Sequence, residues 1–192
     1  MNNDFKRIPY GICDFKQVRK ENKYLVDKSM YFERMERAGN FLFLVRPRRF
    51  GKSLFLNMLE AYYDINEKDN FQELFKGMYA AEHPTEYHNK YQVMHLDFSC
   101  VGSDIDNLSS NFNNYLTGQC ESFIRKYAYL YPKGCEDEVL RGKTGIDMLN
   151  RLNNVARDSG CSLYLIVDEY DNFTNNVLNV KGQQAYHDLT HG

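Results

Sequence analysis

The chain has 192 residues, of which 43% are hydrophobic and 26% charged, and its formal net charge is −2. This composition is close to that of an ordinary globular protein, so it argues against a disordered or fibrous chain and shows no polyanion-binding excess of charge. The longest apolar runs, residues 41–45 and 163–167, are about a quarter of the length that a membrane span needs, and the N-terminus does not resemble a signal peptide. We therefore expect a cytoplasmic protein that does not associate with membranes.

The first half of the chain carries turn, helix and strand signals in succession. A turn is expected at residues 9–11, and apolar residues at helical spacing over 30–38 predict a helix that ends at Gly39. The run FLFLV at 41–45 predicts a strand that is buried on both faces. From Lys52 onward, apolar residues recur every four positions and predict a helix.

The second half repeats the alternation of strands and helices. A short helix is expected near 71–75, a strand at 93–98, helices over about 105–131 and 145–158, and a strand at 163–167, again buried on both faces. This order is typical of an α/β protein with a parallel sheet flanked by helices. No repeat or linker divides the sequence, so we expect residues 1–192 to form one continuous domain.

The cysteines point to a reducing compartment. There are five of them, widely spaced and never in a C-x-x-C pair. An odd number without such pairs argues against both a disulfide framework and a zinc site. We expect free thiols.

The segment RPRRFGKS at 46–53 connects the first predicted strand to the following helix. A Gly-Lys-Ser triplet alone is common, but this strand-to-helix position is the one that a phosphate-binding loop requires. N–H groups at a helix start lack intrahelical acceptors and lie at the positive end of the helix dipole, so they bind anions. We expect Lys52 to reach the β- and γ-phosphates and the Ser53 hydroxyl to ligate Mg²⁺. The predicted nucleotide-binding residues are Arg48, Arg49, Phe50, Gly51, Lys52, Ser53 and Leu54.

The match to the phosphate-loop pattern is incomplete. The pattern G-x-x-x-x-G-K-[ST] has glycine where this chain has Arg46, and Pro47 removes one N–H donor. Arg46, Arg48 and Arg49 bring positive charge to the segment instead. A basic turn without a ligand is the alternative interpretation.

The second candidate feature is LYLIVDEYD at 163–171, where an apolar strand ends in two carboxylates. Open α/β sheets bind their ligands at the carboxyl ends of their strands. We expect Asp168 to hold the magnesium ion opposite Ser53, and Glu169 to polarise the attacking water as the catalytic residue. An acidic strand end that only faces solvent is the alternative.

The chain resembles the bacterial AAA-ATPase-like family, whose members begin with a P-loop module and often carry a PD-(D/E)XK nuclease-like domain at the C-terminus. The family shares the RPRRFGKS form, so the arginine in place of glycine is a family trait. Asp97 lies in a family motif, and it serves either the site or the start of a helix. The resemblance runs along almost the whole chain and rests on IPYG at 8–11, YLVDKS at 24–29, RPRRFGKSL at 46–54, HLDFS at 95–99, IVDEYD at 166–171 and AYHDLTHG at 185–192.

The resemblance implies a P-loop NTPase sheet in which a strand from later in the chain lies between the loop strand and the Asp-Glu strand. Because three strands are predicted here, we expect an incomplete sheet that lacks its central and later strands. The sequence would then be the N-terminal part of a longer protein.

Two classes of function are open. The first is an ATP-binding module that is a Mg²⁺-dependent ATPase in the intact protein and regulates an attached effector, such as the nuclease-like domain. The second is a non-hydrolysing nucleotide-binding scaffold, or a module that contacts nucleic acid or another copy of itself. ATP in place of GTP rests on the resemblance, and the adenine pocket is expected within residues 8–29 without a particular residue to read the base.

Overall fold

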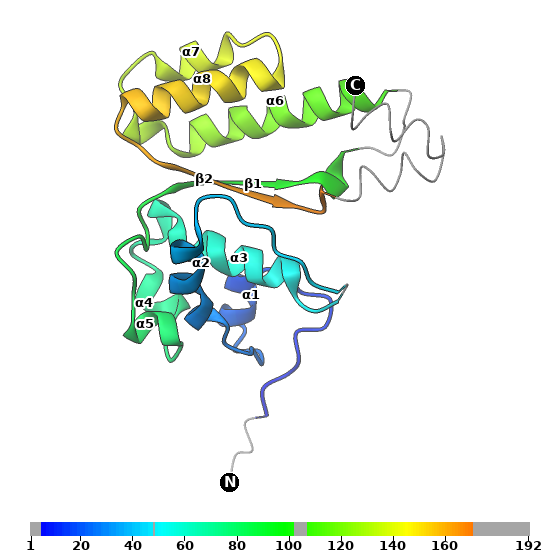
Figure 1. Cartoon of the computed structure of the whole chain (residues 1–192), viewed down its shortest axis with the longest axis vertical. Coiled ribbons are helices and arrows are strands. Elements are labelled where there is room, and N and C mark those ends of the chain that lie inside the picture. Colours follow the sequence, from blue (N-terminus) through cyan, green and yellow to red (C-terminus); the bar gives the residue numbers. More distant parts are fainter. Residues whose placement is uncertain (1–4, 48, 102–106, 171–192) are drawn as a thin grey trace. The chain divides into compact units, whose positions relative to one another are not determined.

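The structure is a computed structural model of the whole chain, and it describes residues 5–47, 49–101 and 107–170 (Figure 1). The chain divides into two compact units between Val93 and Met94. Each unit has buried apolar side chains of its own. The expectation of one domain over residues 1–192 stays a prediction.

The first unit is built from helices around α3 (Lys52–Tyr63), which packs against α1 and α4. One face of α3 is buried through Phe55, Leu59 and Tyr62, so the predicted four-residue period is confirmed. The ring of Tyr62 lies 4.4 Å from that of Phe32, and aromatic pairs of this kind fill the core. The other elements of this unit are α1 (Phe15–Lys20), η1 (Ser29–Tyr31), α2 (Phe32–Ala38), η2 (Ile65–Glu67), α4 (Phe71–Leu74) and α5 (Tyr79–Glu82).

The strand predicted at residues 41–45 is wrong. Residues 41–47 adopt neither helix nor strand, and Phe41 and Val45 are 94% and 83% exposed instead of buried. A strand needs a partner to satisfy its backbone N–H and C=O groups. The described part of the chain forms one two-stranded sheet, and this segment is not in it. An apolar run is therefore insufficient to make a strand here.

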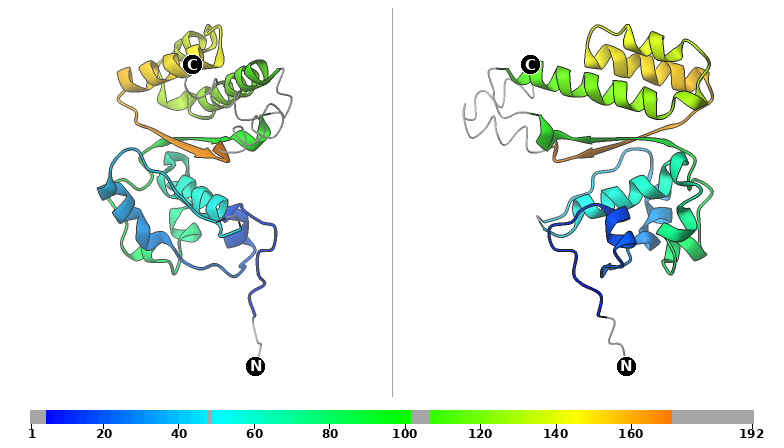
Figure 2. Two further views of the ribbon diagram at one scale, coloured as in Figure 1. Left: turned by 45° about the vertical axis from the view of Figure 1, so that its right-hand side comes forward. Right: turned by 180° about the vertical axis from the view of Figure 1, so that it is seen from behind.

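The second unit contains that sheet and a layer of helices. Strands β1 (Gln92–Asp97) and β2 (Leu163–Asp168) are paired and run in the same direction, with α6 (Leu108–Lys126) and α8 (Gly145–Asp158) on one side of them (Figures 1 and 2). Helix α6 packs against α8, and α7 (Cys135–Leu140) packs against both. Two 3₁₀ turns, η3 (Phe98–Cys100) and η4 (Ala128–Leu130), complete the unit.

Both predicted strands of this unit are confirmed to within one residue, but the burial predicted for the second is wrong. Leu165 in the middle of β2 is 53% exposed, whereas Ile166 is buried. The described fold is therefore mixed, with helices and a small parallel sheet, and it is compatible with an incomplete α/β fold.

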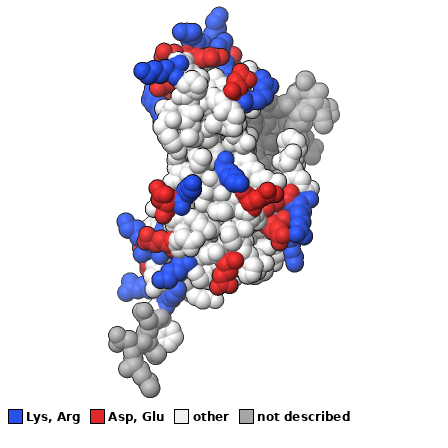
Figure 3. Space-filling view, turned by 90° about the vertical axis from the view of Figure 1, so that its left-hand side faces the viewer, with Lys and Arg blue, Asp and Glu red and all other residues white. Residues whose placement is uncertain are grey.

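Charged side chains of both signs are intermixed on the face of the molecule that Figure 3 shows. Within residues 5–47, 49–101 and 107–170, no helix combines the length and the apolar character that crossing a bilayer requires. All five cysteines are free thiols.

Candidate functional site

Two residues of the loop before α3 have a left-handed backbone conformation. Arg49 has φ 67° and Gly51 has φ 73°, the second being the N-cap of α3. Phe50 donates its N–H to the Pro47 carbonyl at 3.3 Å, and Phe55 donates its N–H to the Gly51 carbonyl at 3.0 Å. This last bond is the first of the α3 ladder, and no side chain caps the helix start. The first turn of α3 therefore has the geometry of an anion-binding helix start.

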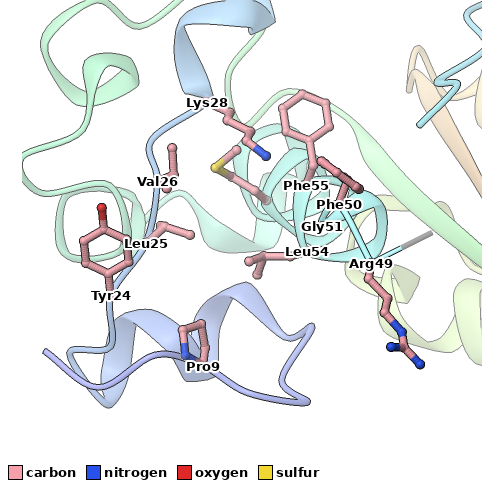
Figure 4. Close-up of a pocket in the computed structure, with 11 residues that line it drawn as sticks. Pro9, Tyr24, Leu25, Val26, Lys28, Arg49, Phe50, Gly51, Leu54 and Phe55 are labelled. Carbon is pink, nitrogen blue, oxygen red and sulfur yellow. The ribbon is translucent and has the colours of Figure 1, made fainter. Parts of the chain in front are cut away.

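A cavity of about 330 Å³ lies beside this loop, within the first unit (Figure 4). Most of its wall is apolar, from segment 24–28 on one side and from α3 on the other. Figure 4 shows the Arg49 guanidinium directed away from the other labelled residues. The apolar wall consists mainly of Leu25, Val26, Leu54, Phe55 and Met58.

Arg46, which stands where the phosphate-loop pattern has glycine, packs against the start of α3. Its Nη1 donates to the Phe50 carbonyl at 3.4 Å, and its guanidinium lies 5.4 Å from the centre of the Phe55 ring. Cation–π contact of this kind holds a guanidinium on an aromatic face. Arg46 therefore braces the loop in addition to bringing charge to it.

The remaining predicted loop residues lie in order along the start of α3. Lys52 and Ser53 are its first two residues and are half-buried, and the Ser53 carbonyl accepts a hydrogen bond from Asn57 Nδ2 at 2.9 Å. Phe50, Gly51 and Leu54 line the cavity. Arg48 lies outside the described residues, as does the closing segment at 185–192.

The second group of predicted residues lies at the carboxyl edge of the sheet in the second unit. Asp168 ends β2 and is 4% exposed, and its Oδ1 accepts the N–H of Glu169 at 2.9 Å. Glu169 has φ 52°, a left-handed conformation that costs a residue with a side chain about 1 kcal/mol. Such strained residues cluster at functional sites.

Asp97 ends β1 at the same edge of the parallel pair. Its Oδ1 accepts the N–H of Ser99 at 2.9 Å, which caps η3, so the helix-start interpretation of Asp97 is confirmed. The N–H of Asp97 donates to the Tyr115 hydroxyl of α6 at 2.7 Å. Burial raises the pKa of Tyr115 above its ordinary value.

The residues present would bind Mg²⁺ only if phosphate oxygens supplied further ligands to the ion. Among the described residues, no three His, Cys, Asp or Glu side chains gather closely enough to hold a metal ion. Mg²⁺ is usually bound by one or two carboxylates, water and substrate phosphates, which a hydroxyl and an aspartate would complete. Because Ser53 belongs to the first unit and Asp168 to the second, their meeting at one ion stays a prediction.

The sequence reasoning did not identify Lys28 as a residue of this site. Its ammonium points toward the start of α3 in Figure 4, and it lines the cavity. Its neighbours Asp27 and Ser29 hydrogen-bond to α5 in the folded chain, a contact between distant residues that the sequence does not reveal.

A relative from Azotobacter chroococcum mcd 1, described as "Uncharacterized protein in vnfD 5'region", is 34% identical over 94 residues. The match covers 48% of this chain and only 17% of that protein. No solved structure matches the chain. A family model described as "Predicted AAA-ATPase" matches residues 9–192. Since this match extends over nearly the whole sequence and includes both the loop before α3 and the end of β2, the chain belongs to the predicted AAA-ATPase family.

Proposed function

We propose that this chain binds ATP with Mg²⁺ at the start of α3. The observation that carries the proposal is the left-handed Gly51, which opens an uncapped α3 directly beside an apolar cavity of about 330 Å³. The helix start suits a phosphate group, and an apolar wall suits a flat aromatic base. Family membership supports ATP as the nucleotide.

The proposed roles of the binding residues follow from their chemistry. The Lys52 ammonium would bind the β- and γ-phosphates, and the N–H groups of Ser53 and Leu54 would bind phosphate oxygens at the first turn of α3. The Ser53 hydroxyl and the Asp168 carboxylate would hold Mg²⁺. When bound, the ion would neutralise the negative charge that develops on the phosphates.

We propose hydrolysis as the reaction of the intact protein, with Glu169 as the catalytic residue. Its carboxylate would accept a proton from water while the water oxygen bonds to the γ-phosphorus. The bond between that phosphorus and the bridging oxygen breaks at the same time, and ADP leaves. The nucleotide state would then regulate an attached effector, for which a nuclease-like C-terminal domain is our candidate.

The nucleic-acid alternative receives less support. The Arg46 guanidinium contacts the Phe50 carbonyl and the Phe55 ring, so part of its hydrogen-bonding and charge is already engaged within the loop. Nucleic-acid binding through phosphates requires several lysine and arginine side chains on one surface.

The test is a calorimetric titration with ATP in the presence and absence of Mg²⁺. Lys52→Ala should abolish measurable binding, and EDTA should weaken binding to the parent chain. Lys76→Ala, at an exposed lysine of the same unit, is the matched control and should bind normally. Equal binding by the Lys52→Ala variant and the parent would refute the phosphate site. A steep salt dependence on a labelled DNA duplex, without a magnesium requirement for ATP, would favour the nucleic-acid alternative.

A further inference from the structure

The two residues that flank Lys28 in segment 24–29 form hydrogen bonds with α5. Asp27 Oδ2 accepts the N–H of Tyr79 at 2.7 Å, and its Oδ1 accepts the N–H of Ser29 at 2.8 Å. The Ser29 hydroxyl accepts the N–H of Ala80 at 3.0 Å, and Ser29 is 2% exposed. Tyr79 and Ala80 begin α5, so both bonds satisfy N–H groups that a helix start leaves without intrahelical acceptors.

Lys28 projects from this fastened segment toward the phosphate loop. A Cβ placed on Gly51 would lie 4.0 Å from Lys28 Nζ, the nearest atom outside the residues that adjoin Gly51 in the chain. Figure 4 shows the ammonium between segment 24–28 and the start of α3. The lysine is half-buried, and the side chains of both its neighbours, Asp27 and Ser29, accept hydrogen bonds from α5. The hydrogen bonds of segment 24–29 with α5 therefore position the Lys28 ammonium beside the loop.

The ammonium of Lys28 is not neutralised by an ion pair with any described residue. Burial lowers the pKa of Lys28, and the positive charge of Arg46 lowers it further. The positive charges of Lys28 and Arg46 therefore both lie near the start of α3 and repel each other. An anion bound between them and the start of α3 would relieve this repulsion.

We infer that Lys28 is a second phosphate-binding lysine of the nucleotide site, acting beside Lys52. This inference rests on the proposed function. The ligand class is a nucleoside polyphosphate, whose several negative charges can engage two ammonium groups and a helix start together. Lys28 is expected to contact the phosphates and not the base, because its ammonium lies close to Gly51 at the start of α3, where the phosphates would bind.

The first experiment compares ATP with adenosine on the full chain. Lys28→Met keeps an unbranched apolar stem but removes the charge, and Lys28→Arg keeps the charge. We expect Lys28→Met to lower the affinity for Mg-ATP by about tenfold or more, the usual effect of losing a charge-assisted hydrogen bond. Adenosine should bind the parent and Lys28→Met equally, and Lys28→Arg should recover most of the ATP affinity.

The outcomes separate this inference from the proposed function. If Lys52→Ala abolishes ATP binding and Lys28→Met leaves it unchanged, the inference is wrong and the nucleotide site stands. If neither substitution changes binding, the nucleotide site itself is wrong. An equal loss of ATP and adenosine affinity in Lys28→Met would also overturn the inference, because the lysine would then act on the base or on the shape of the cavity.

A second experiment uses the unsubstituted chain, so its outcome does not depend on whether a variant folds. The full chain is treated with a limiting amount of an amine-acylating reagent, with and without Mg-ATP, and the modified lysines are quantified by mass spectrometry. Mg-ATP should protect Lys28 at least severalfold while the exposed Lys76 reacts as before. Equal modification of Lys28 under saturating Mg-ATP would overturn the inference.

Discussion

The Gly51 carbonyl accepts the N–H of Phe55 at 3.0 Å while the backbone of Gly51 itself stays left-handed, at φ 73°. This one residue thus ends the loop and starts the α3 hydrogen-bond ladder. A left-handed backbone is available to glycine at little cost and unfavourable for residues with a Cβ. The course of the chain around the proposed phosphate site depends on this position.

Gly51→Ala should weaken Mg-ATP binding and lower the unfolding temperature. A left-handed alanine costs about 1 kcal/mol, which corresponds to a few degrees in a domain of this size. Steric overlap with the rest of the fold is not the reason, since outside the adjoining residues the nearest atom to an added Cβ is Lys28 Nζ at 4.0 Å. Thermal unfolding and ATP titration measure the two effects.

Gly77→Ala is the matched control for this prediction. Gly77 has φ 71° and open space around an added Cβ, and it lies between α4 and α5, away from the loop. It should lose similar stability and bind ATP normally. Equal ATP affinity in the Gly51 and Gly77 variants would show that the left-handed turn is not needed for the site.

Glu169→Gln should separate binding from turnover in the intact protein. Glutamine keeps the shape of the side chain but cannot accept the proton of the attacking water. We expect ATP affinity close to that of the parent and phosphate release slower by a factor of about 100 or more. A single-turnover assay with labelled ATP measures this, and hydrolysis at the parental rate would exclude Glu169 as the general base.

Local patterns were sufficient to predict α3, α8 and both strands of the sheet. Period and apolar character are properties of a short stretch of sequence, and in α3 and β1 the packing agrees with them. The turn before α3 lies where it was expected, but the buried strand that was predicted to precede it does not form, so only the helix side of the predicted strand-to-helix position is confirmed. The cavity beside it is lined by Pro9 and segment 24–28, which belong to the stretch 8–29 expected for the adenine pocket, but which of these residues meet α3 depends on the tertiary fold.

The failure at residues 41–45 has a different cause. The five apolar residues at 41–45 indicate that burial would be favourable. They do not indicate which partner strand would satisfy the hydrogen-bonding groups of their backbone. The short helices α1, α5 and α7 were missed because four to six residues are too few to show a period. The role of Arg46 was missed because a basic residue in a loop can serve either packing or charge, and the sequence does not distinguish them.

Gly145→Ala should destabilise the packing of α8 on α6. A Cβ at Gly145 would lie 2.7 Å from Leu116 Cβ and 2.9 Å from the Asn113 carbonyl oxygen, so backbone would have to move. Overpacking of this kind costs typically 1–3 kcal/mol. Gly118→Ala, inside α6 with nothing within 4 Å of the added carbon, should instead stabilise by about 0.5–1 kcal/mol. Urea unfolding measures both, and a stabilising Gly145→Ala would contradict the close approach of the two helices.

Cys120 lies in the same helix packing. It is fully buried, and its Sγ donates a weak hydrogen bond to the Gly145 carbonyl at 3.8 Å. Burial disfavours the thiolate and raises the pKa of Cys120 from 9.0 to about 11. Below about pH 8 the thiol is protonated in both the folded and the unfolded chain, so this group gives no pH dependence there.

Between about pH 9 and 11 the unfolded chain loses the Cys120 proton and the folded chain keeps it, so stability should fall as the pH rises. The slope from this group is at most about 1.4 kcal/mol per pH unit. Cys120→Ala removes the titrating group, and the small cavity that it leaves costs the same at every pH. Urea unfolding under reducing conditions from pH 7 to 10 should therefore show the free energies of parent and variant converging above pH 9. Parallel profiles for Cys120→Ala and the parent would show that the buried thiol does not titrate differently on folding.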